Sequence, residues 1–151
     1  MSLRDLATPT ALAVPGMLVS DFFRECVRAQ VPGIPFRDAM GRIVGKASIR
    51  HILKMTCLPD YLINNARLLG DGIQHLRLPE IYDREILGLR IDDYILPALP
   101  RVNSSAPVTK ALAIMEQEQT TYIFVLDGEE YHGAISIMSL ARQLLIEAGV
   151  P

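Results

Sequence analysis

The sequence predicts an α+β fold in which two β-α-β-β-α repeats pack together with pseudo-twofold symmetry. This prediction depends on three pairs of similar segments, and the members of each pair are separated by 88 or 89 residues. The pairs are residues 3–9 with 91–97, residues 19–23 with 108–112, and residues 45–49 with 133–137. Three matches at nearly one spacing are far harder to obtain by chance than one, so they indicate an internal duplication.

The same spacing divides the chain into three parts. We expect a first repeat at residues 1–55, a helical insert at 56–88 and a second repeat at 89–151. Neither repeat is large enough to bury a comfortable core by itself, and each small sheet would leave one face open to water. Packing the two repeats together solves both problems.

In the first repeat, a short apolar strand at residues 12–14 precedes a helix that Ser20 is expected to cap. Apolar residues at positions i, i+1 and i+4 predict one buried face on this helix, formed by Phe22, Phe23 and Cys26. A strand at residues 34–36 and a turn at 38–41 follow. Ser48 is then expected to cap a closing helix, whose apolar face contains Ile52 and Leu53.

The second repeat has the same order of elements. A strand near Val102 precedes a helix with Thr109 as its expected cap and with a buried face formed by Ala111, Leu112 and Met115. A strand at residues 122–126 leads to a turn at 127–128. Ser136 is expected to cap the last helix, whose apolar face contains Leu140, Leu144 and Leu145.

The insert is too apolar for a flexible linker. Asp60 is expected to cap a helix that Gly70 ends, and residues 71–72 predict a turn. A second short helix is expected from Pro79 to Leu87, because proline fits the first turn of a helix.

The composition is that of a globular protein, with 50% hydrophobic and 21% charged residues. A net charge of −2 provides no electrostatic basis for non-specific nucleic-acid binding. No apolar run approaches the length of a membrane span, and Asp5 and Pro9 interrupt the N-terminus before a signal segment forms, so we expect a cytoplasmic protein with no membrane contact. Cys26 and Cys57 lack a metal-ligand neighbourhood, and neither a disulfide framework nor a metal site is expected.

Four short motifs carry a resemblance to a known family: DLATP at residues 5–9, GIPFRD at 33–38, GRIVGKAS at 41–48 and GAIS at 133–136. Their order, spacing and duplication resemble the cystathionine-β-synthase (CBS) domain family, and the paired form looks like a Bateman module. The resemblance covers nearly the whole chain except the insert. It implies a regulatory module that binds an adenosine-containing ligand, such as AMP, ATP or S-adenosylmethionine, in a cleft between the repeats.

The resemblance implies one ligand site for each repeat. Backbone groups near the start of the second strand would contact the adenine edge, and the hydroxyl of the G-h-x-S/T-x-x-D motif would contact ribose or phosphate. A helix N-terminus also attracts anions through its free N–H groups. The first site comprises Gly33, Ile34, Pro35, Ser48, Arg50 and His51. The second comprises Tyr122, Ile123, Ser136 and Ser139.

The sequence departs from this motif at its last position, which is usually an aspartate that accepts hydrogen bonds from both ribose hydroxyls. That position is His51 in the first repeat and Ser139 in the second, and neither side chain accepts two charge-assisted bonds as a carboxylate does. Arg50 and His51 would instead favour phosphate. The competing interpretation is that Ser48 and Ser136 only cap helices. Because the first site keeps more of the motif, we expect binding there in preference to the second.

The leading hypothesis is therefore a stand-alone regulatory module that relays ligand occupancy to a partner. The alternative is a ligand-free interaction module with degenerate nucleotide sites. Neither a G-x-S-x-G elbow nor a phosphate loop occurs, so we expect no enzymatic activity and no cofactor other than the regulatory nucleotide. We also expect a homodimer, and an unidentified protein partner, because three apolar helix faces exceed what two small sheets require. These faces are residues 22–26, 62–69 and 140–145.

Overall fold

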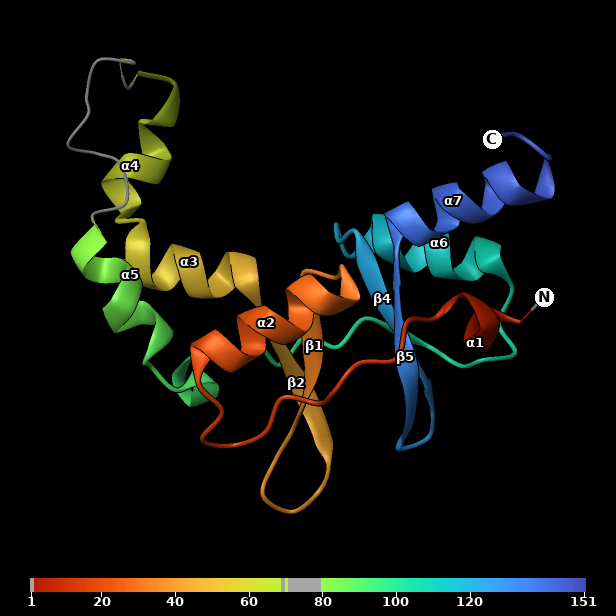
Figure 1. The fold of residues 1–151 in the computed structure, drawn as a ribbon, viewed down its shortest axis with the longest axis horizontal. Helices are drawn as coiled ribbons and strands as arrows, with labels where there is room; N and C mark the ends of the chain where they lie inside the picture. Colours follow the sequence, from red (N-terminus) through yellow and green to blue (C-terminus); the bar gives the residue numbers. More distant parts are fainter. Residues whose placement is uncertain (1, 69, 71–79) are drawn as a thin grey trace.

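The computed structural model describes residues 2–68, 70 and 80–151, and it shows the two repeats (Figure 1). The first repeat contains α2 (Val19–Ala29), β1 (Gly33–Arg37), β2 (Ile43–Ser48) and α3 (Ile49–Cys57). The second contains β3 (Arg101–Val102), α6 (Val108–Gln117), β4 (Tyr122–Asp127), β5 (Glu130–Ser136) and α7 (Ile137–Glu147). The predicted α+β class with duplicated elements is confirmed.

Two hairpins form the centre of the molecule (Figure 1). In each hairpin the strands are antiparallel, and the residue at the start of one strand pairs with the serine that caps the next helix: Gly33 with Ser48, and Tyr122 with Ser136. Strands β1 and β4 contact each other, while α2 and α3 lie at one end of the molecule and α6 and α7 at the other. The sheets therefore face inward and the helices face outward.

The pseudo-twofold relation is clearest at Gly45 and Gly133. The segment at the start of each repeat crosses to the other repeat and pairs with the strand that contains one of these glycines. The paired residues are Lys46 with Leu96 and Ala134 with Thr8, and all four N–H···O distances are 2.9 Å. At both glycines a Cβ atom would overlap the backbone of the crossing segment. The two glycines thus occupy equivalent positions, as their 88-residue spacing predicts.

One core cluster joins the two repeats. It contains Val19, Phe22 and Ile34 from the first repeat, Ile86 from the insert, and Tyr122, Phe124 and Leu126 from the second. The ring of Phe124 is fully buried and makes edge contacts with Tyr122 and Tyr131, at 5.6 and 6.1 Å between ring centres. A smaller cluster packs α6 and α7 against β4 and β5. The larger core requires both repeats, which explains why the small sheets do not stand alone.

The first strand of the first repeat is shorter than predicted. Residues 12–14 do not form a strand; only Ala13 makes an isolated parallel bridge, to Phe36. The Ala13 N–H donates to the Pro35 carbonyl at 2.8 Å, and its carbonyl accepts from the Arg37 N–H at 2.9 Å. One paired residue does not make a ladder, whereas the equivalent strand β3 pairs two residues with β4.

Two predicted helix caps are wrong. Helix α2 begins at Val19, one residue before Ser20, because the Val19 N–H donates to the Leu89 carbonyl at 2.8 Å and needs no hydroxyl. Helix α6 begins at Val108, so Thr109 also lies inside the first turn. Its cap is Pro107, whose extended backbone turns directly into the helix. The caps at Ser48 and Ser136 are confirmed by hydrogen bonds described below.

The insert contains α4 (Asp60–Asn64), the 3-10 helix η1 (Ala66–Leu68) and α5 (Glu80–Leu87), and a further 3-10 helix, η3 (Ile91–Tyr94), lies at the start of the second repeat. The predicted single helix to Gly70 is therefore divided, and Pro59 rather than Asp60 holds its cap position. The expected turn at residues 71–72 and the expected helix start at Pro79 lie outside the described residues. No helix in the described part of the chain is long and apolar enough to cross a membrane.

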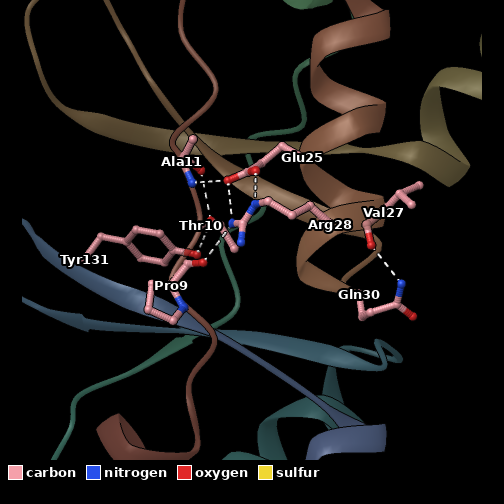
Figure 2. Close-up of polar contacts among 8 residues, drawn as sticks. All are labelled: Pro9, Thr10, Ala11, Glu25, Val27, Arg28, Gln30 and Tyr131. Atoms are coloured by element: carbon pink, nitrogen blue, oxygen red, sulfur yellow. Dashed lines mark hydrogen bonds and ion pairs between the residues drawn. The ribbon is translucent and has the colours of Figure 1, made fainter.

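A polar network attaches residues 9–11, which follow α1 (Leu3–Leu6), to α2 and to Tyr131 (Figure 2). Glu25 on α2 accepts the Ala11 N–H and pairs with Arg28, whose guanidinium also donates to the Pro9 carbonyl at 3.1 Å. The hydrogen bond from Arg28 is the main cause that lowers the pKa of Glu25. The Tyr131 hydroxyl shares a 2.7 Å hydrogen bond with Thr10. The network holds the segment that crosses to β5 in one register.

Candidate ligand-binding cleft

A cavity of about 350 Å³ lies between the two repeats, at the N-terminus of α3. The first repeat contributes Pro32, just before β1, and a group on β2 and α3 formed by Lys46, Ser48, Arg50, His51 and Lys54. The second repeat contributes residues 118–122, which lead from α6 into β4, and the crossing segment contributes Leu96. Because both repeats line the cavity, a change in their relative position would change its shape.

Ser48 fixes the start of α3 on the cavity wall. Its hydroxyl accepts the His51 N–H at 3.4 Å, and the next residue, Ile49, donates its N–H to the Pro32 carbonyl at 3.0 Å. The predicted cap is thus confirmed, and the first turn of the helix is held against the residue that precedes β1. This arrangement directs the N-terminal end of a helix dipole toward the cavity, where an anion is favoured.

Lys46 and Tyr122 form the inner wall of the cleft. Lys46 lies two residues before Ser48 on the same face of β2, and its ammonium nitrogen is 4.7 Å from the centre of the Tyr122 ring. Only 9% of Lys46 and 5% of Tyr122 is exposed. The Tyr122 hydroxyl is buried without a hydrogen-bond partner among the described residues, and it occupies the space that a side chain at Gly33 would need. The glycine therefore makes room for the tyrosine of the other repeat.

The charge of the cleft is strongly positive. Lys46, Arg50, His51 and Lys54 line it, and Glu118 is the single carboxylate among the described lining residues. Partial burial, and then the neighbouring Lys54 ammonium, lower the pKa of His51, which therefore stays neutral to a lower pH than usual. Across the described residues, no group of three His, Cys, Asp or Glu side chains is arranged to hold a metal ion. The cleft is suited to an anionic ligand.

Four of the predicted site residues come together in this cleft: Ser48, Arg50, His51 and Tyr122. Gly33, Ile34, Pro35 and Ile123 are buried within β1 and β4 and are not among the lining residues. Ser136 and Ser139 lie at the start of α7, where the Ser136 hydroxyl accepts the Ser139 N–H at 3.1 Å. Both predicted serine caps are therefore present, and the cavity is at the first of them.

Three charged lining residues were missed by the sequence analysis: Lys46, Lys54 and Glu118. A signal for the two lysines exists in the sequence. Lys46 shares the face of a strand with Ser48, and Lys54 lies one helical turn beyond His51, so both are on the same surface as motif residues. Glu118 has no such signal, because it reaches the cleft from the other repeat.

Solved structures of CBS-domain proteins resemble this chain over nearly its whole length. A CBS domain-containing protein from Bacillus anthracis has a TM-score of 0.63 at 15% identity, covering 97% of this chain and 94% of that one. CBSX2, solved in complex with AMP, has a TM-score of 0.63 at 19% identity, covering 97% and 98%. The chain has the fold of a tandem CBS-domain pair.

The chain also resembles part of a longer protein. Protein MJ1225 from Methanocaldococcus jannaschii has a TM-score of 0.64 at 19% identity, with 95% of this chain but only 47% of MJ1225 covered. The chain thus spans about half the length of that protein. No protein-family model matches the sequence, and no curated protein matches it. The evidence for the tandem CBS fold is therefore structural.

Proposed function

We propose that this CBS pair is a cytoplasmic regulatory module that binds an adenosine-containing ligand, AMP, ATP or S-adenosylmethionine, and relays occupancy to a partner. The observation that supports the proposal most directly is the cleft between the repeats, with the Ser48 cap on one wall and Tyr122 on the other. CBSX2, which shares the fold at 19% identity, was solved with AMP. The two free cysteines accord with a reducing compartment.

The relay follows from the position of the cleft. Its walls belong to different repeats, so a ligand that contacts both stabilises one relative arrangement of β2 and β4 over others. The crossing segment carries the effect outward, because Leu96 lines the cleft and is hydrogen-bonded to Lys46. Ligand binding would thus alter the surface that a partner contacts. No chemical step is part of this function.

Replacing Ser48 with alanine tests the ligand site. Loss of a hydroxyl that contacts a charged ligand is expected to weaken AMP or ATP binding by about 10- to 100-fold. Ser136→Ala is the matched control, because it removes the equivalent cap of α7 and costs similar stability, about 1 kcal/mol. Isothermal titration measures the affinities. Unchanged binding in Ser48→Ala together with lost binding in Ser136→Ala would move the site to the second repeat.

We further propose a homodimer that uses the outer face of the second repeat. A groove of about 430 Å³ lies between α1, α6 and α7 and is lined mainly by apolar side chains, among them Leu6, Val108, Leu112, Leu140 and Leu144. Leu144 is 67% exposed, and Ile146 beside it is 62% exposed. A twofold interface is self-complementary, so one such face serves both subunits. The earlier candidate face at residues 22–26 contributes less, because Phe22 and Cys26 are fully buried in the monomer core.

Leu144→Glu is expected to raise the dimer dissociation constant about tenfold or more, because the charge would be buried at the interface. The monomer should keep its stability, since Leu144 is mostly exposed. Light scattering measures the mass against the 16.7 kDa of one chain. Met40→Glu, at the exposed tip of the β1–β2 hairpin, is the control and should leave the dimer intact. A wild-type monomer at micromolar concentrations would contradict the proposal.

A ligand-free interaction module is the second candidate function, favoured by His51 and Ser139 at the positions where the motif has its aspartate. A thermal-shift screen with AMP, ATP and S-adenosylmethionine distinguishes the two. A ligand that binds the native state raises the midpoint as its concentration exceeds Kd. No shift with any of the three, in a protein that still dimerises, would favour the interaction module.

A further inference from the structure

Among the described residues, no carboxylate forms an ion pair with the positive charges of the cleft. None of Lys46, Arg50, His51 and Lys54 has a carboxylate within 4.0 Å among the described side chains. Arg50 and Lys54 are exposed, whereas only 9% of Lys46 is exposed. The ammonium nitrogen of Lys46 lies on the cavity wall, 4.7 Å from the centre of the Tyr122 ring. A cation on the wall of a cavity, with no carboxylate partner among the described side chains, is suited to binding an anionic ligand.

The second repeat provides an internal control for these charges. At the 88-residue spacing, the positions equivalent to Lys46, Arg50, His51 and Lys54 are Ala134, Met138, Ser139 and Arg142. The second repeat forms the same hairpin and the same capped helix with one basic residue in place of four. The fold therefore does not require the basic group. The basic group is therefore a feature of the first cleft alone.

We propose that the first cleft binds one ligand per chain through a chain of two or more phosphates, and that Lys46 determines this specificity. The inference deepens the proposed function and depends on the same cleft. Each added phosphate increases the attraction to the three cations Lys46, Arg50 and Lys54, whereas the sulfonium of S-adenosylmethionine is repelled by them. The buried Lys46 acts most strongly, because attraction between charges grows as water is excluded. The phosphate chain can belong to a nucleotide or to inorganic polyphosphate.

Titration calorimetry on the full chain, at one fixed ionic strength, tests the ligand class with ATP, ADP, AMP, S-adenosylmethionine and inorganic tripolyphosphate. We expect affinity to fall from ATP to ADP to AMP, by about tenfold or more overall, with one site per chain. S-adenosylmethionine should produce no binding heat, and salt should weaken ATP binding. Competition by tripolyphosphate would show that the phosphate chain alone suffices.

The outcomes separate this inference from the proposed function. If AMP or S-adenosylmethionine binds as tightly as ATP, the polyphosphate inference is overturned while the adenosine site stands. If tripolyphosphate binds and no adenosine compound does, the inference stands and the proposed function fails. Two equivalent ATP sites per chain would overturn the inference as well, since the second repeat lacks the basic group. Absence of binding by all five compounds overturns both.

Lys46→Met tests the specificity residue, because methionine keeps most of the side-chain length against Tyr122 and removes the charge. ATP affinity is expected to fall about tenfold and AMP affinity less, so the ratio of the two Kd values shrinks. Arg142→Met, the basic position of the second repeat, is the matched control and should leave the ratio unchanged. Lys54→Met, at an exposed position, repeats the test if Lys46→Met does not fold. An unchanged ATP-to-AMP ratio in the folded Lys46 or Lys54 variant would overturn the proposal.

Discussion

Gly133→Ala is expected to destabilise the protein by about 2–5 kcal/mol. Gly133 has φ +149°, which side-chain-bearing residues rarely adopt, and a Cβ there would lie 2.5 Å from the Thr8 carbonyl oxygen and 2.7 Å from its carbon. These are backbone atoms held by two hydrogen bonds between Thr8 and Ala134, so they have no side-chain rotamer to relieve the overlap. The free energy of unfolding in urea measures the effect.

Gly88→Ala is the control, because the nearest atom to a new Cβ there is 3.7 Å away. It should change stability by no more than about 1 kcal/mol. Gly45→Ala should behave like Gly133→Ala, since its Cβ would overlap the Leu96 backbone in the equivalent crossing. If the Gly133→Ala and Gly88→Ala variants were equally stable, the result would contradict the pairing of the N-terminal segment with β5.

Phe124→Ala is expected to cost about 3–5 kcal/mol, the range for a fully buried aromatic residue. The loss should appear as one cooperative transition, because the core around Phe124 contains residues of both repeats and of the insert. Tyr61→Ala removes a ring that is 62% exposed and should cost under about 0.5 kcal/mol. Both stabilities are measured by urea unfolding followed by circular dichroism and by tyrosine fluorescence.

The number of transitions in Phe124→Ala decides whether the repeats fold together. Two separated transitions, or a cost similar to that of Tyr61→Ala, would mean that the repeats have independent cores. The assigned boundaries at residues 55–56 and 88–89 remain predictions. They describe where the sequence repeats, while the larger core contains Ile86 of the insert and Phe22 of the first repeat together.

Local sequence patterns predicted some helix starts correctly and others wrongly. Ser48 and Ser136 were predicted correctly because each is the last residue of a strand and its hydroxyl accepts the N–H of the third residue of the helix. Ser20 and Thr109 have the same chemistry, yet the helices begin before them. The difference at α2 is a partner from outside the helix, the Leu89 carbonyl, which accepts the N–H of Val19. No local pattern indicates a backbone acceptor 70 residues away.

In the candidate cleft, too, local sequence predicted some residues, while the positions of others depend on tertiary packing. Ser48, Arg50 and His51 were predicted from one motif, because neighbours in a strand–helix junction share a surface whatever surrounds them. Tyr122 was predicted for the second site, but it lines the first cleft, because the pseudo-twofold axis brings β4 against β1. The burial of Lys46 and the position of Glu118 depend on the same packing.

The sequence by itself determined the duplication, the α-β-β-α order that both repeats share and the serine caps at the two closing helices. Each of these depends on spacing along the chain, and spacing is a property of sequence. Only the tertiary structure decided that the segments at the start of the repeats exchange partners, that one core cluster joins both repeats, and that four basic side chains line one cavity. These features join residues up to 126 positions apart, such as Thr8 and Ala134. Contacts between residues so far apart depend on how the whole chain packs, and short sequence patterns do not predict them.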